Sequence, residues 1–300
     1  MYVVTGATGN TGSIVAHRLL ESGKKVRVIA RNTERLQVLA SAGAEPFAAD
    51  LTDETKLARA FSGAEAVYAM IPPNPASQDP GADQRRIGES IATALEKAGV
   101  KRAVSLSSIG ADKSSGTGPV AGLHEFEELL NNVPGLNVVH LRAGYFMENT
   151  LGQGAAIRAM GKTVGPLRGD LKLPMIATRD IGEVAADVLL KLDFNGRQTR
   201  ELQGQRDLSY NEATAIIAEA IEKPEIKYVQ LPDEQIQPVL VQMGMSPAMA
   251  GMILEMSAAL NSGHMRALEP RSARTTTRTS YETFVAEVLL PVYKGQVRAA

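Results

Sequence analysis

The sequence predicts an α/β protein built around a doubly wound parallel sheet. Two observations carry this prediction. Short apolar runs alternate with amphipathic helical segments through the first half of the chain, and a glycine-rich turn joins the first apolar run to the first helix. In a parallel sheet, each helix returns the chain to the start of the next strand, which is the order that this alternation describes.

The elements follow one another in a regular order. Strands are expected at 2–4, 25–30, 44–49, 66–71, 102–106 and 137–142. Helices are expected after Gly12 and at 34–39, 54–61, 82–98 and 120–131. The long helix carries Ile87, Ile91 and Leu95 at helical spacing, which predicts that one face packs on the sheet.

Beyond Arg142 the alternation stops. Residues 144–169 are rich in glycine and show little pattern typical of strands. The pattern at 181–192 predicts a helix, and that at 200–203 predicts a further strand. Ser209 and Glu212 have the spacing of a capping box, and the rest of the tail is expected to be mostly helical, ending with a helix at 281–290. We therefore expect a first domain of 1–151, to which residues about 175–204 return, and a smaller domain of 152–174 and 205–300 for substrate or partner.

Composition excludes several classes of protein. The chain has 300 residues, 44% hydrophobic and 22% charged, with a formal net charge of -1, so no overall basic field exists to hold nucleic acid or an anionic membrane. It has no cysteine, which removes disulfides and thiolate chemistry, and His17 and His264 lack partners at metal spacing. No apolar run approaches the roughly 20 residues of a membrane helix. We expect a cytoplasmic protein with no metal and with small molecules or proteins as partners.

The turn after the first strand indicates a dinucleotide site. Gly6, Gly9 and Gly12 stand between the apolar run Tyr2–Val4 and the first helix. A tight turn, a close approach of the backbone to a diphosphate, and close packing of helix on strand each exclude a Cβ. The free N–H groups at the start of the helix would then face the phosphates.

Residues after the second and third strands refine this hypothesis, because ligands of open parallel sheets bind at the carboxyl ends of the strands. Arg31 stands where an acidic residue would accept the ribose hydroxyls of NAD, and a guanidinium suits the 2′-phosphate of NADP. The alternative is that Arg31 or Arg35 is only a surface charge. Asp50 and Leu51 would flank the adenine, although Asp50 could instead cap the next helix.

Candidate catalytic residues follow the fifth strand. Ser107 and Ser108 come directly after it, and the next helix brings His124. A hydroxyl could polarise a carbonyl, and an imidazole could hold a ribose or shuttle a proton. The alternatives are that the serines bond to the backbone and that His124 is only a polar neighbour.

Other polar or soft residues have simpler interpretations. His140 lies in an apolar run and is expected to be a core residue with satisfied hydrogen bonds. The basic stretch from Arg266 to Arg278 is expected to be a solvated face. Five methionines between Met243 and Met256 are expected in one helical stretch, where they suit core packing, a pocket wall or a partner surface. The proline-rich loop that begins at Pro72 either covers the cofactor as a lid, with Pro72 in contact with it, or merely connects two elements.

Several segments together resemble the NmrA-like branch of the atypical short-chain dehydrogenase/reductases. The resemblance covers about two thirds of the chain and is carried by residues 5–12, 30–32, 107–108, 141–149 and 178–182. It implies an NADP-binding Rossmann domain, a small, mainly helical C-terminal domain and a cleft between them that takes a small-molecule substrate. It also implies roles for individual residues: the diphosphate would contact Gly6, Thr8, Gly9, Asn10, Thr11 and Gly12, the 2′-phosphate would contact Arg31, the adenosine side would be lined by Asp50, Leu51 and Ile71, and the nicotinamide would lie near Ser107 and Tyr145.

The chain departs from the wider superfamily at one important place. That superfamily uses a tyrosine followed four residues later by a lysine, and here those positions hold Val120 and His124. The usual proton donor is therefore missing, which disfavours a nucleotide-sugar epimerase. Two hypotheses stay open: an NADPH-dependent reductase of a small conjugated carbonyl such as a quinone, and a non-catalytic NADP(H) sensor that acts through a protein partner. A homodimer is compatible with either.

Overall fold

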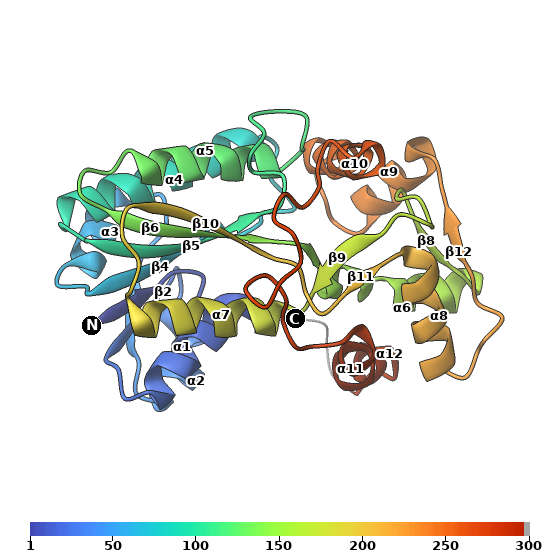
Figure 1. Cartoon of the computed structure of the whole chain (residues 1–300), viewed down its shortest axis with the longest axis horizontal. Coiled ribbons are helices and arrows are strands. Elements are labelled where there is room, and N and C mark those ends of the chain that lie inside the picture. The colour runs from blue at the N-terminus through green and yellow to red at the C-terminus, as the bar shows by residue number, and fades with distance from the viewer. Residues whose placement is uncertain (297–300) are drawn as a thin grey trace.

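The computed structural model describes residues 1–296 and contains a seven-stranded parallel sheet with helices on both faces (Figure 1). The strands lie in the order β10-β6-β5-β4-β1-β2-β3. Their bounds are β1 (Tyr2–Val4), β2 (Val26–Ala30), β3 (Glu45–Ala48), β4 (Ala66–Ala69), β5 (Arg102–Ser108), β6 (Asn137–Ala143) and β10 (Arg197–Leu202). The predicted doubly wound parallel sheet is confirmed.

Two groups of helices cover the two faces of this sheet. Figure 1 shows one group above the sheet and the other below it, and its labels identify the α-helices of each group. The first group is α3 (Glu54–Phe61), α4 (Pro80–Lys97) and α5 (Val120–Asn131). The second group is α1 (Asn10–Glu21), the short η1 (Thr33–Leu36) and α2 (Gln37–Ser41), and α7 (Thr178–Lys191). Apolar strand residues fill both interfaces, because strands covered on both sides bury alternate side chains in each direction.

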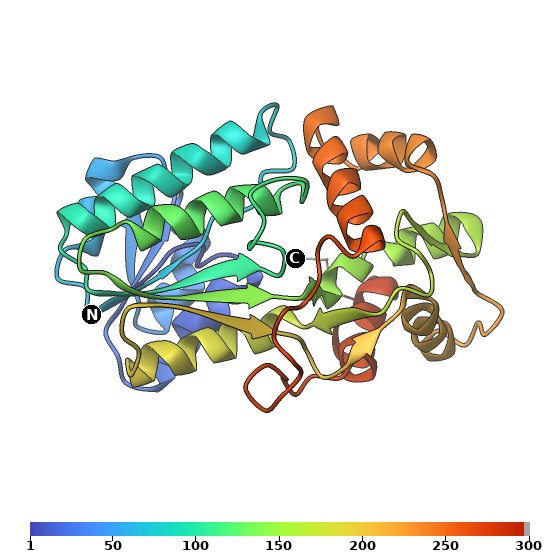
Figure 2. The same ribbon diagram turned by 45° about the horizontal axis from the view of Figure 1, so that its top comes forward.

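The remaining elements form a second region beside the carboxyl ends of the main-sheet strands, where Figure 2 shows those strands ending. Its strands make two small sheets: β7 (Tyr145–Phe146), β9 (Leu173–Ile176) and β11 (Asp207–Leu208) in one, β8 (Thr163–Gly165) and β12 (Tyr228–Gln230) in the other. Its helices are η2 (Met147–Thr150), α6 (Gln153–Met160), α8 (Tyr210–Ala220), α9 (Asp233–Gln242), α10 (Pro247–Ser262), α11 (Tyr281–Phe284), the π-helix η3 (Val285–Leu289) and α12 (Leu290–Tyr293). A separate apolar cluster fills this region.

The structure corrects several expectations about elements. The second region contains short strands where the sequence predicted none, including β7 and β8 within the glycine-rich stretch 144–169. The five methionines do not share one helix, because α9 ends before Met243 and α10 begins after Met245. The capping box at α8 is present as predicted: Ser209 accepts from the backbone N–H of Glu212, whose carboxylate accepts from the N–H of Ser209.

Candidate active site

The glycine-rich turn has the geometry that its sequence predicts. Gly6 has a φ of +61°, and a Cβ there would lie 2.4 Å from the Sδ of Met70. A Cβ on Gly12 would lie 2.3 Å from the carbonyl oxygen of Gly6, so α1 packs directly against the turn. The hydroxyl of Thr5 accepts from the backbone N–H of Met70, 3.0 Å away, and fixes the end of β1 beside the end of β4. Larger residues are therefore excluded from Gly6 and Gly12.

The start of α1 leaves its first backbone N–H groups without a side-chain cap. Gly9 is the N-cap residue and supplies no side-chain acceptor, while Thr8, Gly9 and Asn10 are exposed. Thr11 differs from this group because its side chain is buried and its hydroxyl accepts from the phenol of Tyr68 at 3.0 Å. The uncapped N–H groups suit a diphosphate, and the backbone N–H of Thr11 is one of them.

Arg31 follows β2 at the same edge of the sheet. Its side chain is exposed and forms no hydrogen bond or ion pair with any residue within 1–296. Two hydrogen bonds from Thr52 lower the pKa of Asp50, chiefly the bond from the backbone N–H, and the charges of Arg31 and Arg86 lower it further. β2 and β3 are neighbouring parallel strands with Ala30 opposite Ala48, so Arg31 and Asp50 follow adjacent strand ends at one edge of the sheet.

Asp50 does not cap the next helix. Its carboxylate accepts from the backbone N–H and the hydroxyl of Thr52, at 2.9 and 2.7 Å. Asp53 is the residue that caps α3, because it accepts from the backbone N–H of Lys56 at 3.0 Å. Asp50 is exposed beside the half-buried Leu51, which leaves both available to a ligand at this edge.

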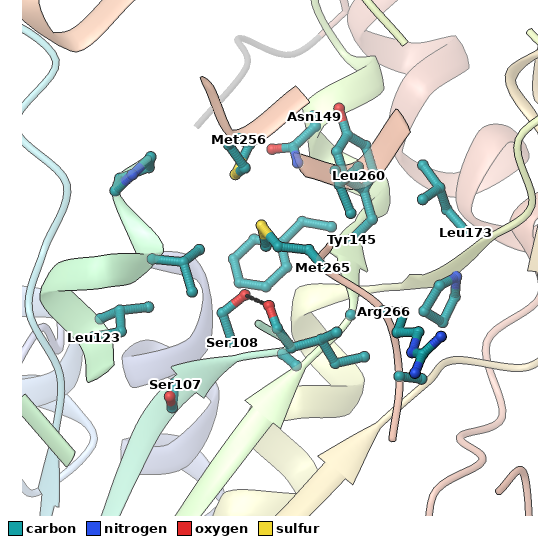
Figure 3. A pocket seen from close by; sticks show the side chains of 18 of the residues that line it. Ser107, Ser108, Leu123, Tyr145, Asn149, Leu173, Met256, Leu260, Met265 and Arg266 are labelled. Atoms are coloured by element: carbon teal, nitrogen blue, oxygen red, sulfur yellow. Dashed lines mark hydrogen bonds between the residues drawn. The ribbon is translucent and has the colours of Figure 1, made fainter. Parts of the chain in front are cut away.

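A cavity of about 610 Å³ adjoins the turn, at the carboxyl ends of β4, β5 and β6. Figure 3 shows it from close by. Side chains of the sheet and its following loops line one side, and the second region lines the other. The lining is mostly apolar and includes Met70, Ile71, Leu106, Val120, Leu123, Ala143, Phe146, Leu173, Met256, Leu260 and Met265. Such an enclosure, with a few polar groups, is typical of a small-molecule site.

Ser107 and Ser108 line this cavity, but both hydroxyls already have acceptors. The two residues are the last of β5, not the first after it as the sequence predicted. Ser107 donates to the buried carboxylate of Glu127, which in turn forms two hydrogen bonds with Arg142 at 3.0 and 2.6 Å. Ser108 donates to the carbonyl oxygen of Ile109 at 3.0 Å.

His124 is not among the residues that line the cavity, although Val120 and Leu123 from the same helix are. Its Nδ1–H donates to the carbonyl oxygen of Ala111 at 2.9 Å, which fixes the ring and its tautomer. Within 1–296 its Nε2 has no hydrogen-bond partner, and the side chain is half-buried. The imidazole is thus held at one nitrogen and free at the other.

Tyr145 brings a phenol to the cavity. Its hydroxyl shares a hydrogen bond of 2.9 Å with the hydroxyl of Tyr210, and the two rings meet edge to face with centroids 6.1 Å apart. Burial raises the pKa of both phenols, so both are neutral at physiological pH. Nothing in the sequence around Tyr210 indicated this pairing, because Tyr210 follows a helix cap far along the chain.

The proline-rich loop 72–79 is tied to the second region. Pro73 lines the cavity, whereas Pro72 is half-buried and does not. The backbone N–H of Ser246, at the start of α10, donates to the carbonyl oxygen of Pro75 at 2.9 Å. The hydroxyl of Ser246 donates to the carbonyl oxygen of Ser77. These anchors favour the interpretation of the loop as a connection between the two regions. They disfavour the interpretation as a free lid.

The basic stretch is not a uniform solvated face. Arg271 pairs with Asp207, and Arg274 pairs with Glu269 at 2.9 Å. Arg266 instead lines the cavity, a position that the sequence did not predict.

His140 is a core residue with satisfied hydrogen bonds, as predicted. Its Nδ1 accepts from Ser105 at 2.7 Å and its Nε2–H donates to Asn131 at 3.0 Å, while burial lowers its pKa. Among residues 1–296 no cluster of three or more metal-ligating side chains occurs. The helices of the same range include none that is both long and apolar enough to cross a bilayer.

A glycine turn opening a helix at the edge of a doubly wound sheet, beside an apolar cavity, defines a Rossmann-type dinucleotide protein. Residues 2–285 match the model of the NmrA-like family, and the chain belongs to that family. The resemblance noted from the sequence is confirmed.

Known proteins of similar sequence and structure include reductases. The chain is 30% identical over 224 residues to (4-alkanoyl-5-oxo-2,5-dihydrofuran-3-yl)methyl phosphate reductase of Streptomyces griseus, covering 75% of each protein. Its structure is similar to that of Escherichia coli NADPH-dependent quinone oxidoreductase QOR2 in complex with NADPH, with a TM-score of 0.82, 25% identity, and coverage of 96% and 99% of the two chains. The negative transcriptional regulator NmrA in complex with NADP shares the fold, with a TM-score of 0.67, 17% identity, and coverage of 99% and 98%.

Proposed function

We propose that this protein is an NADPH-dependent reductase of a small, flat, conjugated carbonyl compound such as a quinone. The observation that carries the proposal is the position of the cavity. Met70 lines it and also packs on Gly6 of the glycine turn, so a ligand in the cavity would lie next to a dinucleotide at the turn. The names of the two reductases above support a conjugated carbonyl as the substrate, since one names a quinone and the other an oxo-dihydrofuran that carries a methyl phosphate group.

The residues at the sheet edge fit NADPH. The uncapped start of α1 would hold the diphosphate, and the unpaired guanidinium of Arg31 would hold the 2′-phosphate. Asp50, Leu51 and Ile71 would line the adenosine side. His124, whose Nδ1–H donates to Ala111, has Nε2 free to accept from a ribose hydroxyl. When bound, NADPH supplies the hydride.

The cavity suits the reduction of a conjugated carbonyl without a dedicated proton donor. Its apolar walls exclude water from a flat ring, and the neutral phenol of Tyr145, which can accept from Tyr210 and donate its own proton, is available to orient an oxygen. Val120 occupies the place of the usual tyrosine and offers no proton. A quinone reduced by a hydride becomes a stabilised phenolate, which can take its proton from solvent, so the missing tyrosine does not prevent this reaction.

The alternative hypothesis, an NADP(H) sensor without turnover, uses the same cofactor residues. A sensor has no need of a substrate-sized apolar cavity beside the nicotinamide end of the site, and the presence of one favours a reductase. The two hypotheses differ in one direct observable, which is the consumption of bound NADPH.

The test is NADPH oxidation by the purified protein against a panel of quinones, enones and aldehydes, with NADH in parallel. We expect turnover of quinones or enones with NADPH preferred. His124→Ala should weaken NADPH binding, whereas His17→Ala, on α1 and outside the cavity, should not. Binding of NADPH without turnover of any compound in the panel would favour the sensor.

A further inference from the structure

Three charged side chains line the cavity, and two of them are neutralised by partners. Lys172 forms an ion pair with Glu212, and Asp207 forms one with Arg271. Arg266 forms no ion pair or hydrogen bond with any residue in the described range 1–296, and its side chain is exposed. The cavity therefore has one unpaired positive charge at its lining.

The backbone that carries Arg266 is held firmly on both sides. The N–H of Met265 donates to the carbonyl oxygen of Ala259 at 3.0 Å, at the end of α10. The N–H of Leu268 donates to both carboxylate oxygens of the buried Glu201 on β10, at 2.9 and 3.0 Å. An arginine on a fixed backbone loses less freedom on binding than one on a free loop, which favours a binding role.

Arg266 lies at one end of the cavity. Figure 3 shows it on the side of Leu173, away from Ser107 and Leu123. Ser107 lies near the end of β5, β5 pairs with β4, and β4 ends beside the glycine turn. The end of the cavity opposite Arg266 is therefore the end nearer the dinucleotide. A substrate with its reducible ring at that inner end would direct a substituent toward Arg266.

We infer that Arg266 determines specificity for substrates that carry an oxyanion group, a carboxylate or a phosphate monoester, at the end distant from the reducible carbonyl. The inference rests on the proposed function for its kinetic readout, but not for its binding readout. A guanidinium offers paired, parallel N–H donors that match both kinds of oxyanion, and it stays charged at every physiological pH. The apolar walls would hold the ring while the guanidinium fixes its direction.

The experiment compares matched substrates. The first is a 2-methyl-1,4-naphthoquinone with a propanoate arm on the quinone ring, the second is its methyl ester, and the third carries a propyl phosphate arm. The three share one reducible ring and differ in the charge of the arm. We expect kcat/KM for the acid to exceed that for the ester, and to fall as ionic strength rises, while kcat/KM for the ester stays constant. Comparison of acid with phosphate identifies which oxyanion is preferred.

Variants then assign the preference to Arg266. Arg266→Gln should lower kcat/KM for the acid about tenfold, the loss expected for one charge-assisted pair of hydrogen bonds, and leave the ester unchanged. Arg266→Lys should retain part of the preference. The control is Arg278→Gln, which removes the same charge from an exposed residue of the same segment outside the cavity. Equal losses for acid and ester in Arg266→Gln, or an equal loss of acid preference in Arg278→Gln, would overturn the inference.

Calorimetry separates this inference from the proposed function. Binding of the acid and the ester to the protein saturated with NADP⁺ needs no turnover. If no quinone is reduced but the acid binds more tightly than the ester only when Arg266 is present, the anion site stands and the reductase proposal fails. If the ester is reduced and the acid gains nothing from Arg266 in either assay, the reductase proposal stands and the anion site fails.

Discussion

The buried pair of Glu127 and Arg142 provides the sharpest test of the packing behind the cavity. Glu127 lies on α5 and accepts from Ser107 at the cavity wall and from two guanidinium nitrogens of Arg142 on β6. The hydrogen bond to Glu127 raises the pKa of Arg142, against the opposing effect of burial. Arg142→Met would keep the apolar stem of the side chain and leave the carboxylate buried without its counter-charge.

The structure sets the size of the expected loss. The side chains of Arg142 and Glu127 are 15% and 4% exposed. Removing one partner of a buried pair costs about 3–5 kcal/mol, and the residual exposure of Arg142 places the expected loss near the lower end, about 3 kcal/mol.

A matched exposed pair, whose carboxylate lies on the same helix α5 and whose arginine lies on α4, supplies the control. Arg85 donates to Glu125 through two nitrogens at 3.1 and 3.0 Å, but these side chains are 58% and 40% exposed. Arg85→Met should therefore leave stability almost unchanged. The assay is urea unfolding followed by far-ultraviolet circular dichroism, since the chain has no tryptophan. Equal losses in the two variants would refute this reasoning.

Further predictions concern the cofactor site and its surroundings. Arg31→Ala should weaken the binding of NADP roughly ten- to hundredfold and the binding of NAD little, because it removes charge-assisted hydrogen bonds to the 2′-phosphate. Equal losses of affinity for both dinucleotides in calorimetry would show that Arg31 does not bind the 2′-phosphate. Gly12→Ala should lower the unfolding free energy by about 1–3 kcal/mol, since its Cβ would lie 2.3 Å from a backbone oxygen of the turn. Gly9→Ala, whose nearest contact is 3.3 Å, is the control, and equal thermal shifts in both would contradict this account. Hydrogen bonds, first from Lys172 and then from the α8 cap, lower the pKa of Glu212 from 4.5 to about 2, so its stabilisation is present above 4.5 and is lost as pH falls toward 2. The melting temperatures of the wild type and Glu212→Gln should converge in that range, and a constant difference would argue against the ion pair.

Local patterns predicted the main sheet and its helices well, for physical reasons. Strands such as β1 and β4 are apolar and buried on both faces, so their runs are continuous and easily recognised. The short strands of the second region escaped because they have two to four residues and depend on distant partners. Tyr145 of β7, for example, pairs with Met175 of β9, and no sequence pattern near either residue indicates this strand pairing.

The residues of the candidate site likewise divide into those that local sequence predicted and those that it could not predict. The glycine turn could be predicted because φ and close packing select glycine locally, whatever the rest of the fold. The hydrogen-bond partners of Ser107 and Tyr145 could not be predicted, because Glu127 and Tyr210 are distant in sequence and carry no local signal. Arg266 was hidden among similar arginines, and only the three-dimensional structure separates the one that lines the cavity from those that form ion pairs.

The central claim is that NADPH held at the sheet edge reduces a conjugated carbonyl in the adjoining cavity. The most direct measurement is rapid mixing of the NADPH-loaded protein with 2-methyl-1,4-naphthoquinone, following NADPH absorbance and hydroquinone formation together. The account predicts loss of bound NADPH with one hydroquinone formed for each NADPH consumed. Bound NADPH that persists with the quinone as long as it does in buffer would contradict it.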